Sequence, residues 1–270
     1  EHPRNAFKEL LKLAKKQFPV SLTDVIFSIA PRINAAGRLR SGRHAVELMV
    51  SLQLDEIEQL AQAINQDNIE RRELDQQITQ EALDIITNRW KEKELYSNVV
   101  FSPTWHKGVV GIVASRLIEK YYRPTIVLTE SQGRITGSAR SIRDFNVYDA
   151  LNSCAQFLEQ FGGHKYAAGM TLKRENLDAF IEAFESYAKE NITPEMLVEE
   201  QEVDLPLGFN QIYGKEENRM KIPRLKRILN QFEPHGPGNM KPVFMSKNVF
   251  STDMRLLKDA HIKLSMTQPE

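Results

Sequence analysis

The chain has 270 residues, 41% of them hydrophobic and 27% charged, and its 36 basic residues balance its 36 acidic ones. These values exclude a disordered or uniformly basic chain and predict two or three globular domains, in which only local patches could bind nucleic acid. No apolar run reaches the roughly 20 residues of a membrane-spanning helix, and the amphipathic stretch Glu1 to Lys16 is unlike a secretory leader, so we expect a cytoplasmic protein with no membrane partner.

The first part of the chain predicts helices around one irregular loop. Apolar residues in 5–17 recur at helical spacing, Pro31 and Gly37 bound the predicted loop, and a helix carrying Ala45 and Leu48 follows. Residues 54–90 contain no glycine or proline, and their apolar residues recur at steps of three and four. This predicts one long helix, or two abutting helices, of the kind that connects two domains.

Strands and helices alternate in the middle of the chain, which predicts a compact α/β domain. The patterns predict strands at 97–102, 123–130, 133–141 and 165–173, and helices at 107–122, 146–161 and 176–191. The single cysteine, Cys154, lies among apolar residues of one predicted helix. It excludes an internal disulfide and is expected to be a buried, inert thiol.

The last part of the chain predicts a small β-barrel or sandwich. Strand patterns occur at 202–207, 242–252 and 261–266, with a basic helix at 224–232 and a proline and glycine hinge at 233–244. The sequence stops after what reads as one strand of an unfinished sheet, so we expect this chain to be a fragment of a longer protein.

No local metal site or nucleotide-binding loop is visible in the sequence. The aspartates are scattered, and no two of the 6 histidines stand four residues apart. The glycine motifs that bind dinucleotides or nucleoside triphosphates are also absent.

Phosphate contacts are the better candidates. Ser138 and Arg140 in "ITGSARS" would project from one face of a strand, where a hydroxyl and a guanidinium can bind phosphate oxygens. His106 and His164 each stand at a strand end or beside glycine, where contact with an anion and a simple loop-fixing hydrogen bond both stay open. The segment 30–43 carries a group of arginines suited to phosphates: Arg32, Arg38, Arg40 and Arg43.

Several stretches, in this order, resemble the RecJ family of single-strand-specific DNA exonucleases. They are "PRINAAGRL", "ERREL", "WHKGVVGIVASRLIEKYYRPTIVL", "GSARSI", "FGGHKYAAGMTL" and "EPHGPGN" with "PVF". The resemblance implies an α/β fold, with a DHHA1-type domain joined by a long helix to a remnant of the DHH domain and followed by a partial OB-fold. It sets these at 1–50 (remnant of the DHH domain), 51–95 (connecting helix), 96–191 (DHHA1 domain) and 192–270 (partial OB-fold).

The family resemblance implies 5′-to-3′ hydrolysis of single-stranded DNA with Mn²⁺ or Mg²⁺, in recombination and repair. The family's metal ligands lie in an N-terminal DHH domain, so no metal is expected to bind this chain, and the chain alone is expected to be inactive. Single-stranded DNA is the implied partner, together with a single-strand-binding protein or a helicase.

The resemblance also implies roles for individual residues. Arg32 matches an arginine at the strand entrance, and Ser138 and Arg140 match the pocket for the DNA 5′ phosphate, although Ala139 stands where the family often has glycine. His106 matches the "WH-G" motif, with a loop-fixing or phosphate-facing role. The glycine-histidine signature that faces the scissile phosphate, with His164 as its catalytic residue, matches Gly162, Gly163 and His164.

Three alternatives to the exonuclease remain. One is a DHH/DHHA1 phosphodiesterase acting on short oligonucleotides or cyclic dinucleotides, although such enzymes usually lack an OB-fold. The second is a catalytically inactive, nucleic-acid-binding relative. The third is an RNA-binding role like that of the DHHA1 appendage of alanyl-tRNA synthetases, in which the arginine loop and the long helix are not expected.

Overall fold

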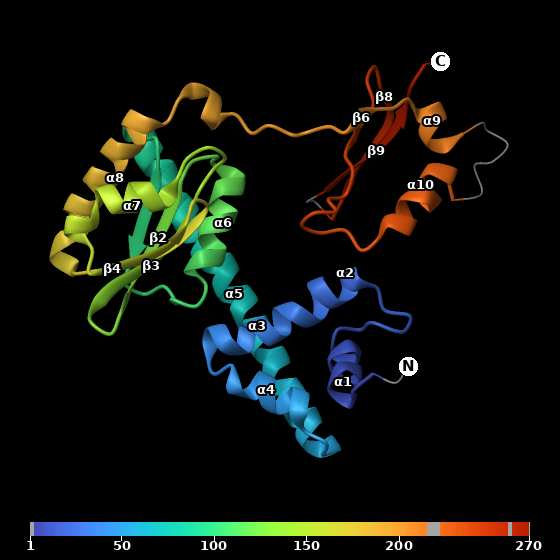
Figure 1. Cartoon of the computed structure of the whole chain (residues 1–270), viewed down its shortest axis with the longest axis horizontal. Coiled ribbons are helices and arrows are strands. Elements are labelled where there is room, and N and C mark those ends of the chain that lie inside the picture. The colour runs from blue at the N-terminus through green and yellow to red at the C-terminus, as the bar shows by residue number, and fades with distance from the viewer. Residues whose placement is uncertain (1–2, 215–221, 259–260, 270) are drawn as a thin grey trace. The chain divides into compact units, whose positions relative to one another are not determined.

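The structure is a computed structural model that describes residues 3–214, 222–258 and 261–269. Its internal contacts divide the chain into two units, Glu1–Glu199 and Glu200–Glu270 (Figure 1). The first unit begins with the helices α1 (Asn5–Leu13), α2 (Leu22–Asp24), α3 (Ala30–Leu39), α4 (Arg43–Val50) and α5 (Leu54–Glu92), with a π-helical turn at Val25–Ile29.

The predicted irregular loop between Pro31 and Gly37 is wrong, because these residues form helix α3. Pro31 stands at the start of α3, directly after the π-helical turn at Val25–Ile29, so the chain is helical on both sides of the proline. Ala35 and Ala36 are fully buried against the neighbouring helices, so tertiary packing outweighs the low helix propensity of Gly37.

Helix α5 is one continuous helix of 39 residues, the first of the two predicted arrangements, and it contributes to two separate apolar cores. Ile57, Ala61 and Ile64 pack with α1, α3 and α4, whereas Ile78, Ala82 and Ile86 pack with the α/β part of the unit. Between these cores the buried residues of α5 are polar: Asp67, Asn68 and Asp75. Arg40 binds Asp67 Oδ1 at 2.6 Å and Arg116 binds Asp75 Oδ2 at 2.7 Å, so each buried carboxylate has a cationic partner. The second oxygen of each, Asp67 Oδ2 and Asp75 Oδ1, has no hydrogen-bond partner among the described residues.

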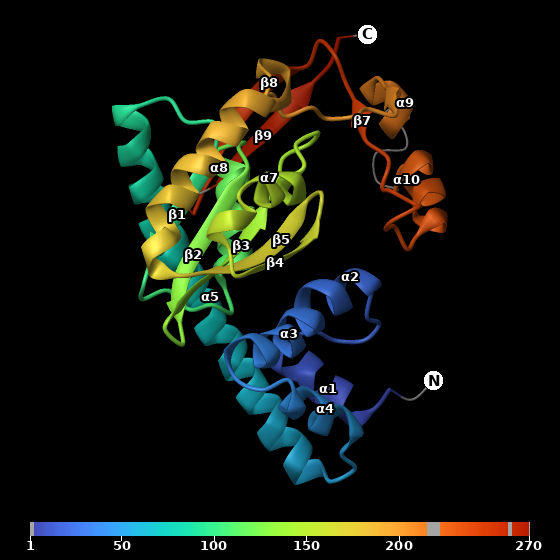
Figure 2. The same ribbon diagram turned by 60° about the vertical axis from the view of Figure 1, so that its left-hand side comes forward.

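A five-stranded sheet forms the α/β part, in the order β1-β2-β3-β5-β4. Only β1 and β2 are parallel, and the other neighbouring strands are antiparallel. Helices α7 and α8 cover one face, and α5 and α6 pack on part of the other (Figure 2). The elements are β1 (Asn98–Ser102), α6 (Val110–Lys120), β2 (Thr125–Ser131), β3 (Arg134–Arg140), α7 (Val147–Ser153), β4 (Gln160–His164), β5 (Ala167–Leu172) and α8 (Leu177–Asn191).

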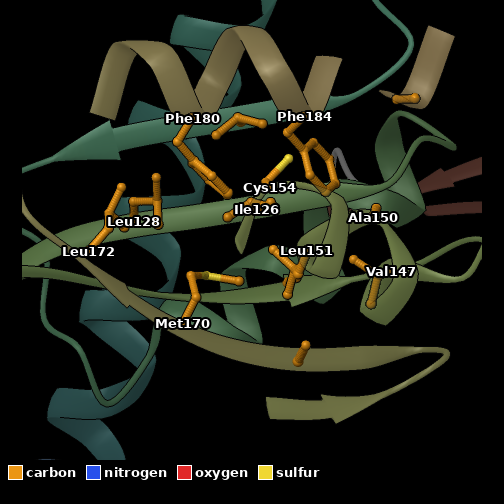
Figure 3. Packing of buried hydrophobic residues seen from close by; sticks show 14 of the residues in the cluster. Ile126, Leu128, Val147, Ala150, Leu151, Cys154, Met170, Leu172, Phe180 and Phe184 are labelled. Atoms are coloured by element: carbon orange, nitrogen blue, oxygen red, sulfur yellow. The ribbon is translucent and has the colours of Figure 1, made fainter. Parts of the chain in front are cut away.

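The main core lies between the sheet and helices α7 and α8 (Figure 3). Phe180 and Phe184 of α8 are fully buried against Ile126 and Leu128 of β2. Cys154 lies inside this core, where burial raises the pKa of its thiol, as expected for an inert cysteine.

Strand β4 was not predicted. The helix expected at 146–161 ends at Ser153, and after a 3-10 turn at Ala155–Phe157 the chain enters the edge strand Gln160–His164. Its two glycines and exposed histidine give no strand pattern, and the strand exists because β5 pairs with it.

The second unit contains two small sheets and short helices. Strand β6 (Leu205–Pro206) pairs with β7 (Phe244–Met245), and β8 (Phe250–Leu257) pairs with β9 (His261–Thr267). The predicted strand at 242–252 is therefore divided between β7 and β8. The unit also contains the helices α9 (Phe209–Tyr213) and α10 (Arg224–Leu229) and a 3-10 turn at Asn230–Phe232. In neither unit is a described helix both long enough and apolar enough to span a bilayer.

Candidate functional site

Ser138 and Arg140 confirm the predicted strand geometry and lie together against the start of helix α6. An Arg140 Nη1 proton is donated to Ser138 Oγ, 2.7 Å away, and Nη1 is also 2.7 Å from the Ala139 carbonyl oxygen. A Cβ atom placed on Gly111, in the first turn of α6, would lie 3.0 Å from Arg140 Nη2 and 3.1 Å from Ser138 Oγ. Glycine at this position therefore lets the helix start pack closely on the guanidinium.

A second arginine, Arg38 at the end of α3, lies close enough to act on Arg140. Burial lowers the pKa of Arg140, and the positive charge of Arg38 lowers it further. Neither arginine is paired with a carboxylate among the residues that the structure describes. Two unpaired cations beside the positive end of a helix dipole favour an anion, and a planar guanidinium suits phosphate oxygens.

Gly108 joins helix α3 to the α/β part of the unit. Arg38 Nη1 donates to the Gly108 carbonyl oxygen at 3.2 Å, and a Cβ atom on Gly108 would overlap the Arg38 carbonyl oxygen. His106 Nδ1 accepts the Gly108 N–H at 3.1 Å, a contact that closes the loop before α6. The approach of Arg38 to Arg140 thus depends on a glycine at position 108.

Ser138 and Arg140 of β3 and Gly162 and His164 of β4 share one face of the sheet, whereas Gly163, the register partner of Ala168, belongs to the opposite face. Arg140, Ala167 and His164 are register partners on the neighbouring strands β3, β5 and β4. The next row toward the sheet interior consists of Ser138, Gly169 and Gly162. Since alternate residues point to opposite faces, both rows face away from the core that α7 and α8 cover. Two strand spacings separate β3 from β4 at about 10 Å.

Three glycines of β4 and β5 stand at their positions for different structural reasons. Gly163 has φ +153°, and a Cβ atom there would overlap the Ala167 carbonyl oxygen, so the backbone requires glycine. A Cβ atom on Gly162 would meet no atom within 4 Å, and one on Gly169 would meet only the Gly137 carbonyl oxygen at 3.8 Å. Neither steric crowding nor a positive φ requires glycine at positions 162 and 169. The lack of a side chain there leaves free space on the surface of the sheet.

His164 stands at the exposed end of β4, with Nδ1 accepting the Tyr166 N–H at 3.3 Å. Its Nε2 has no hydrogen-bond partner among the described residues. Arg32 is not brought into this group. Its guanidinium donates to Asn65 Oδ1 at 2.9 Å and to the Ser28 carbonyl oxygen at 2.5 Å, within the helical part of the unit.

The sequence groups Arg38 with the other arginines of 30–43 that suit phosphates, but it does not connect Arg38 with Ser138 and Arg140. It gives no signal for Gly111 as a site residue. A helix predicted over 30–39 would place Arg38 in its last turn, where its side chain can contact another part of the fold.

Within the residues that the structure describes, no group of three or more histidine, cysteine, aspartate or glutamate side chains could hold a metal ion. Ser138, Arg140 and His164 include no carboxylate, and the guanidinium of Arg140 has only hydrogen-bond donors and no lone pair to offer a metal ion. These residues therefore do not fit Mn²⁺ or Mg²⁺.

Comparison with family models finds a DHHA1 domain at residues 92–190 and a RecJ OB domain at residues 215–270. The single-stranded-DNA-specific exonuclease RecJ of Bacillus subtilis (strain 168) is 36% identical over 268 residues, covering 97% of this chain and 33% of that protein. The fold class is thus confirmed, whereas the predicted domain boundaries stay predictions.

Two crystal structures of RecJ from Thermus thermophilus are similar over 97% of this chain. The complex with Mn²⁺ gives a TM-score of 0.79 at 28% identity, with 37% of that chain covered. The complex with Mg²⁺ gives 0.77 at 27% identity, with 39% covered. The chain therefore spans between about a third and a half of the length of the relatives it matches.

Proposed function

Because the chain belongs to the RecJ family, we propose that it is the substrate-binding part of a 5′-to-3′ single-stranded-DNA exonuclease. The observation that carries this proposal is the pair of unpaired arginines, Arg38 and Arg140, at the start of α6 beside Ser138. This group would bind the 5′ phosphate of the strand and so select the end at which hydrolysis begins.

The sheet face that carries Ser138, Arg140 and His164, which we call the open face, would set the direction of the bound DNA strand. With the 5′ phosphate bound by the Arg140 side chain on β3, the next phosphate would lie toward β4, where the His164 side chain could reach it. The exposed His164 side chain and the free space at Gly162 support contact with the scissile phosphate. His164 would stabilise negative charge on that phosphate as the bond breaks.

The metal ions of the reaction would be held outside this chain. No group of side chains among its described residues forms a cation site. We propose that Mn²⁺ or Mg²⁺ is bound by the part of the longer RecJ-family protein that lies outside the region matched by this chain. What this chain contributes is binding of the strand end and charge stabilisation at one phosphate.

We expect the 270-residue chain alone to bind single-stranded DNA without degrading it. Binding should weaken as the salt concentration rises. Binding releases cations that are condensed on the DNA phosphates, and the entropy gained by this release is smaller at high salt. A gel assay with Mn²⁺ and an end-labelled strand measures both properties. Progressive shortening of the strand by purified chain would contradict the proposed division of roles.

Replacement of His164 by alanine should lower turnover by about 10²- to 10³-fold in a RecJ-family protein that carries this chain and the metal-binding part. Single-turnover cleavage at saturating Mn²⁺ measures the effect. The matched readout is the affinity for a 5′-phosphorylated strand, which should stay unchanged because Arg140 holds that end. An unchanged rate would rule out His164 as a catalytic residue.

The remaining assignments follow from the same proposal. The protein would act in the cytoplasm in DNA recombination and repair, with a single-strand-binding protein or a helicase as partner. His106 would fix the loop before α6, a role that its contact with Gly108 supports. Arg32 would act at the strand entrance, with part of its guanidinium already engaged by Asn65 and Ser28.

A further inference from the structure

The open face of the sheet continues beyond the two rows described above into a third row, which is polar and neutral. Thr136, Thr171 and Gln160 are register partners on β3, β5 and β4. Thr136 is two residues from Ser138 on β3 and therefore points to the same face as Ser138 and Arg140. Its register partners Thr171 and Gln160 point to that face as well. Gln160 is exposed, and Thr136 and Thr171 are half-buried.

The hydrogen-bonding capacity of this row is largely unused. Thr136 Oγ1 donates to the Met170 carbonyl oxygen at 3.3 Å. The side chains of Thr171 and Gln160 make no hydrogen bond to any residue that the structure describes. An amide both donates and accepts, and so does a hydroxyl, so the pair can meet the edge of any base without selecting one.

The first nucleoside of the DNA connects the 5′ phosphate to the scissile phosphate, so the positions of these two phosphates determine which sheet residues the nucleoside covers. A strand held at Arg140 and crossing to His164 must carry its first nucleoside over Ala167 and Gly169 of β5. The end of the sheet beside Arg140 also bears Lys165 and His164, whereas the opposite direction along β5 leads to Thr171. A neutral base fits the polar row better than the cationic end.

We propose that Thr171 and Gln160 form a subsite for the base of the 5′-terminal nucleotide, with its sugar over Gly169. The subsite rests on the proposed function, because the 5′ phosphate at Arg140 sets the starting point of the strand. It gives a reason for glycine at 169, where a Cβ atom would make only an ordinary contact with the protein but would occupy the space of the sugar. Since the contacts tolerate any base, sequence-independent binding follows.

The test uses 5′-phosphorylated oligonucleotides bound to the 270-residue chain, with fluorescence anisotropy as the measurement. One oligonucleotide has all its bases, a second lacks the base of the first nucleotide, and a third lacks the base of a nucleotide near the 3′ end. Loss of the first base should weaken binding about three- to tenfold, and loss of the distant base should have a smaller effect. The double variant Thr171→Val with Gln160→Ala should bind the first two oligonucleotides equally.

Gln156→Ala is the matched control, because Gln156 is an exposed glutamine outside this face. It should keep the full penalty for the missing first base. A penalty that survives in the double variant, or that is absent from the unmodified chain, would overturn the subsite. If the unmodified chain does not prefer a 5′ phosphate to a 5′ hydroxyl, the proposed function fails instead, and the two failures are thus distinguished.

A space-filling variant tests the sugar position separately. Gly169→Leu should weaken binding of the complete oligonucleotide at least tenfold and leave competition by inorganic phosphate unchanged, because Arg140 is not altered. Thermal unfolding of this variant shows whether it is folded. A folded Gly169→Leu chain that binds the complete oligonucleotide normally would contradict the position of the sugar over β5.

Discussion

Replacing Arg140 by alanine should remove the preference of the chain for a 5′-phosphorylated strand. The side chain is half-buried, lies within hydrogen-bonding distance of Ser138 Oγ and has no carboxylate partner among the described residues, so its charge is available to a phosphate. A charge-assisted hydrogen bond of this kind contributes about 1.5–3 kcal/mol, or roughly 10- to 100-fold in affinity. Titration with otherwise identical 5′-phosphate and 5′-hydroxyl strands measures the loss.

Arg134→Ala is the matched control for this expectation. Arg134 begins the same strand β3, but it is exposed and its Nε lies 2.7 Å from Glu159 Oε2. The control should keep the 5′-phosphate preference and lose only a small, salt-sensitive part of the total affinity. Equal behaviour of the two variants would show that Arg140 contributes general charge rather than a pocket.

Gly108→Ala should both destabilise the first unit and weaken 5′-phosphate binding. The added methyl group overlaps the Arg38 carbonyl oxygen, so helix α3 or the loop before α6 has to move. Overpacking against a backbone costs about 1–3 kcal/mol, and a displaced α3 takes Arg38 away from Arg140. Thermal unfolding measures the first effect, and titration with a 5′-phosphorylated strand measures the second, which we expect to be about tenfold.

Gly37→Ala provides the comparison within helix α3 itself. A Cβ atom on Gly37 would meet only the Gly42 Cα, at an ordinary distance of 3.8 Å. Alanine is the better helix former, so this variant should be equally stable or more stable by up to about 1 kcal/mol, with unchanged binding. If both glycine variants bind the phosphorylated strand normally, Gly108 does not set the position of Arg38.

Local sequence patterns predicted the α/β part of the fold because its signals are local. Buried strands such as β2 are continuous apolar runs, and α8 repeats its apolar residues at helical spacing. The burial of Cys154 followed in the same way from its apolar neighbours. The single long helix α5 needed only the absence of glycine and proline over a long stretch.

The errors arose where distant residues decide the structure. Helix α3 contains proline and glycine and is held by burial of Ala35 and Ala36 against other helices. Strand β4 has almost no apolar pattern and is defined by its pairing with β5. In both cases tertiary packing outweighs the local preference of the residues.

The candidate site was predicted in pieces rather than as a surface. The common face of Ser138 and Arg140 followed from strand alternation, and the proposed role of His164 rests on the family resemblance. Their common face depends on the strand order β3-β5-β4, which no local pattern encodes. Arg38 joins them only through the contact of α3 with Gly108, which is 70 residues away in sequence.

Helix α5 determines how the two parts of the first unit are rotated relative to each other about the helix axis. Its two apolar cores are centred on Ala61 and Ala82, and each core fixes one part of the unit on its own side of the helix. One residue added between them would turn one part by about 100° about the helix axis and shift it by about 1.5 Å. Arg38 and Arg140 belong to different parts, so a change of one residue in the length between the cores would separate the two arginines without altering either of them.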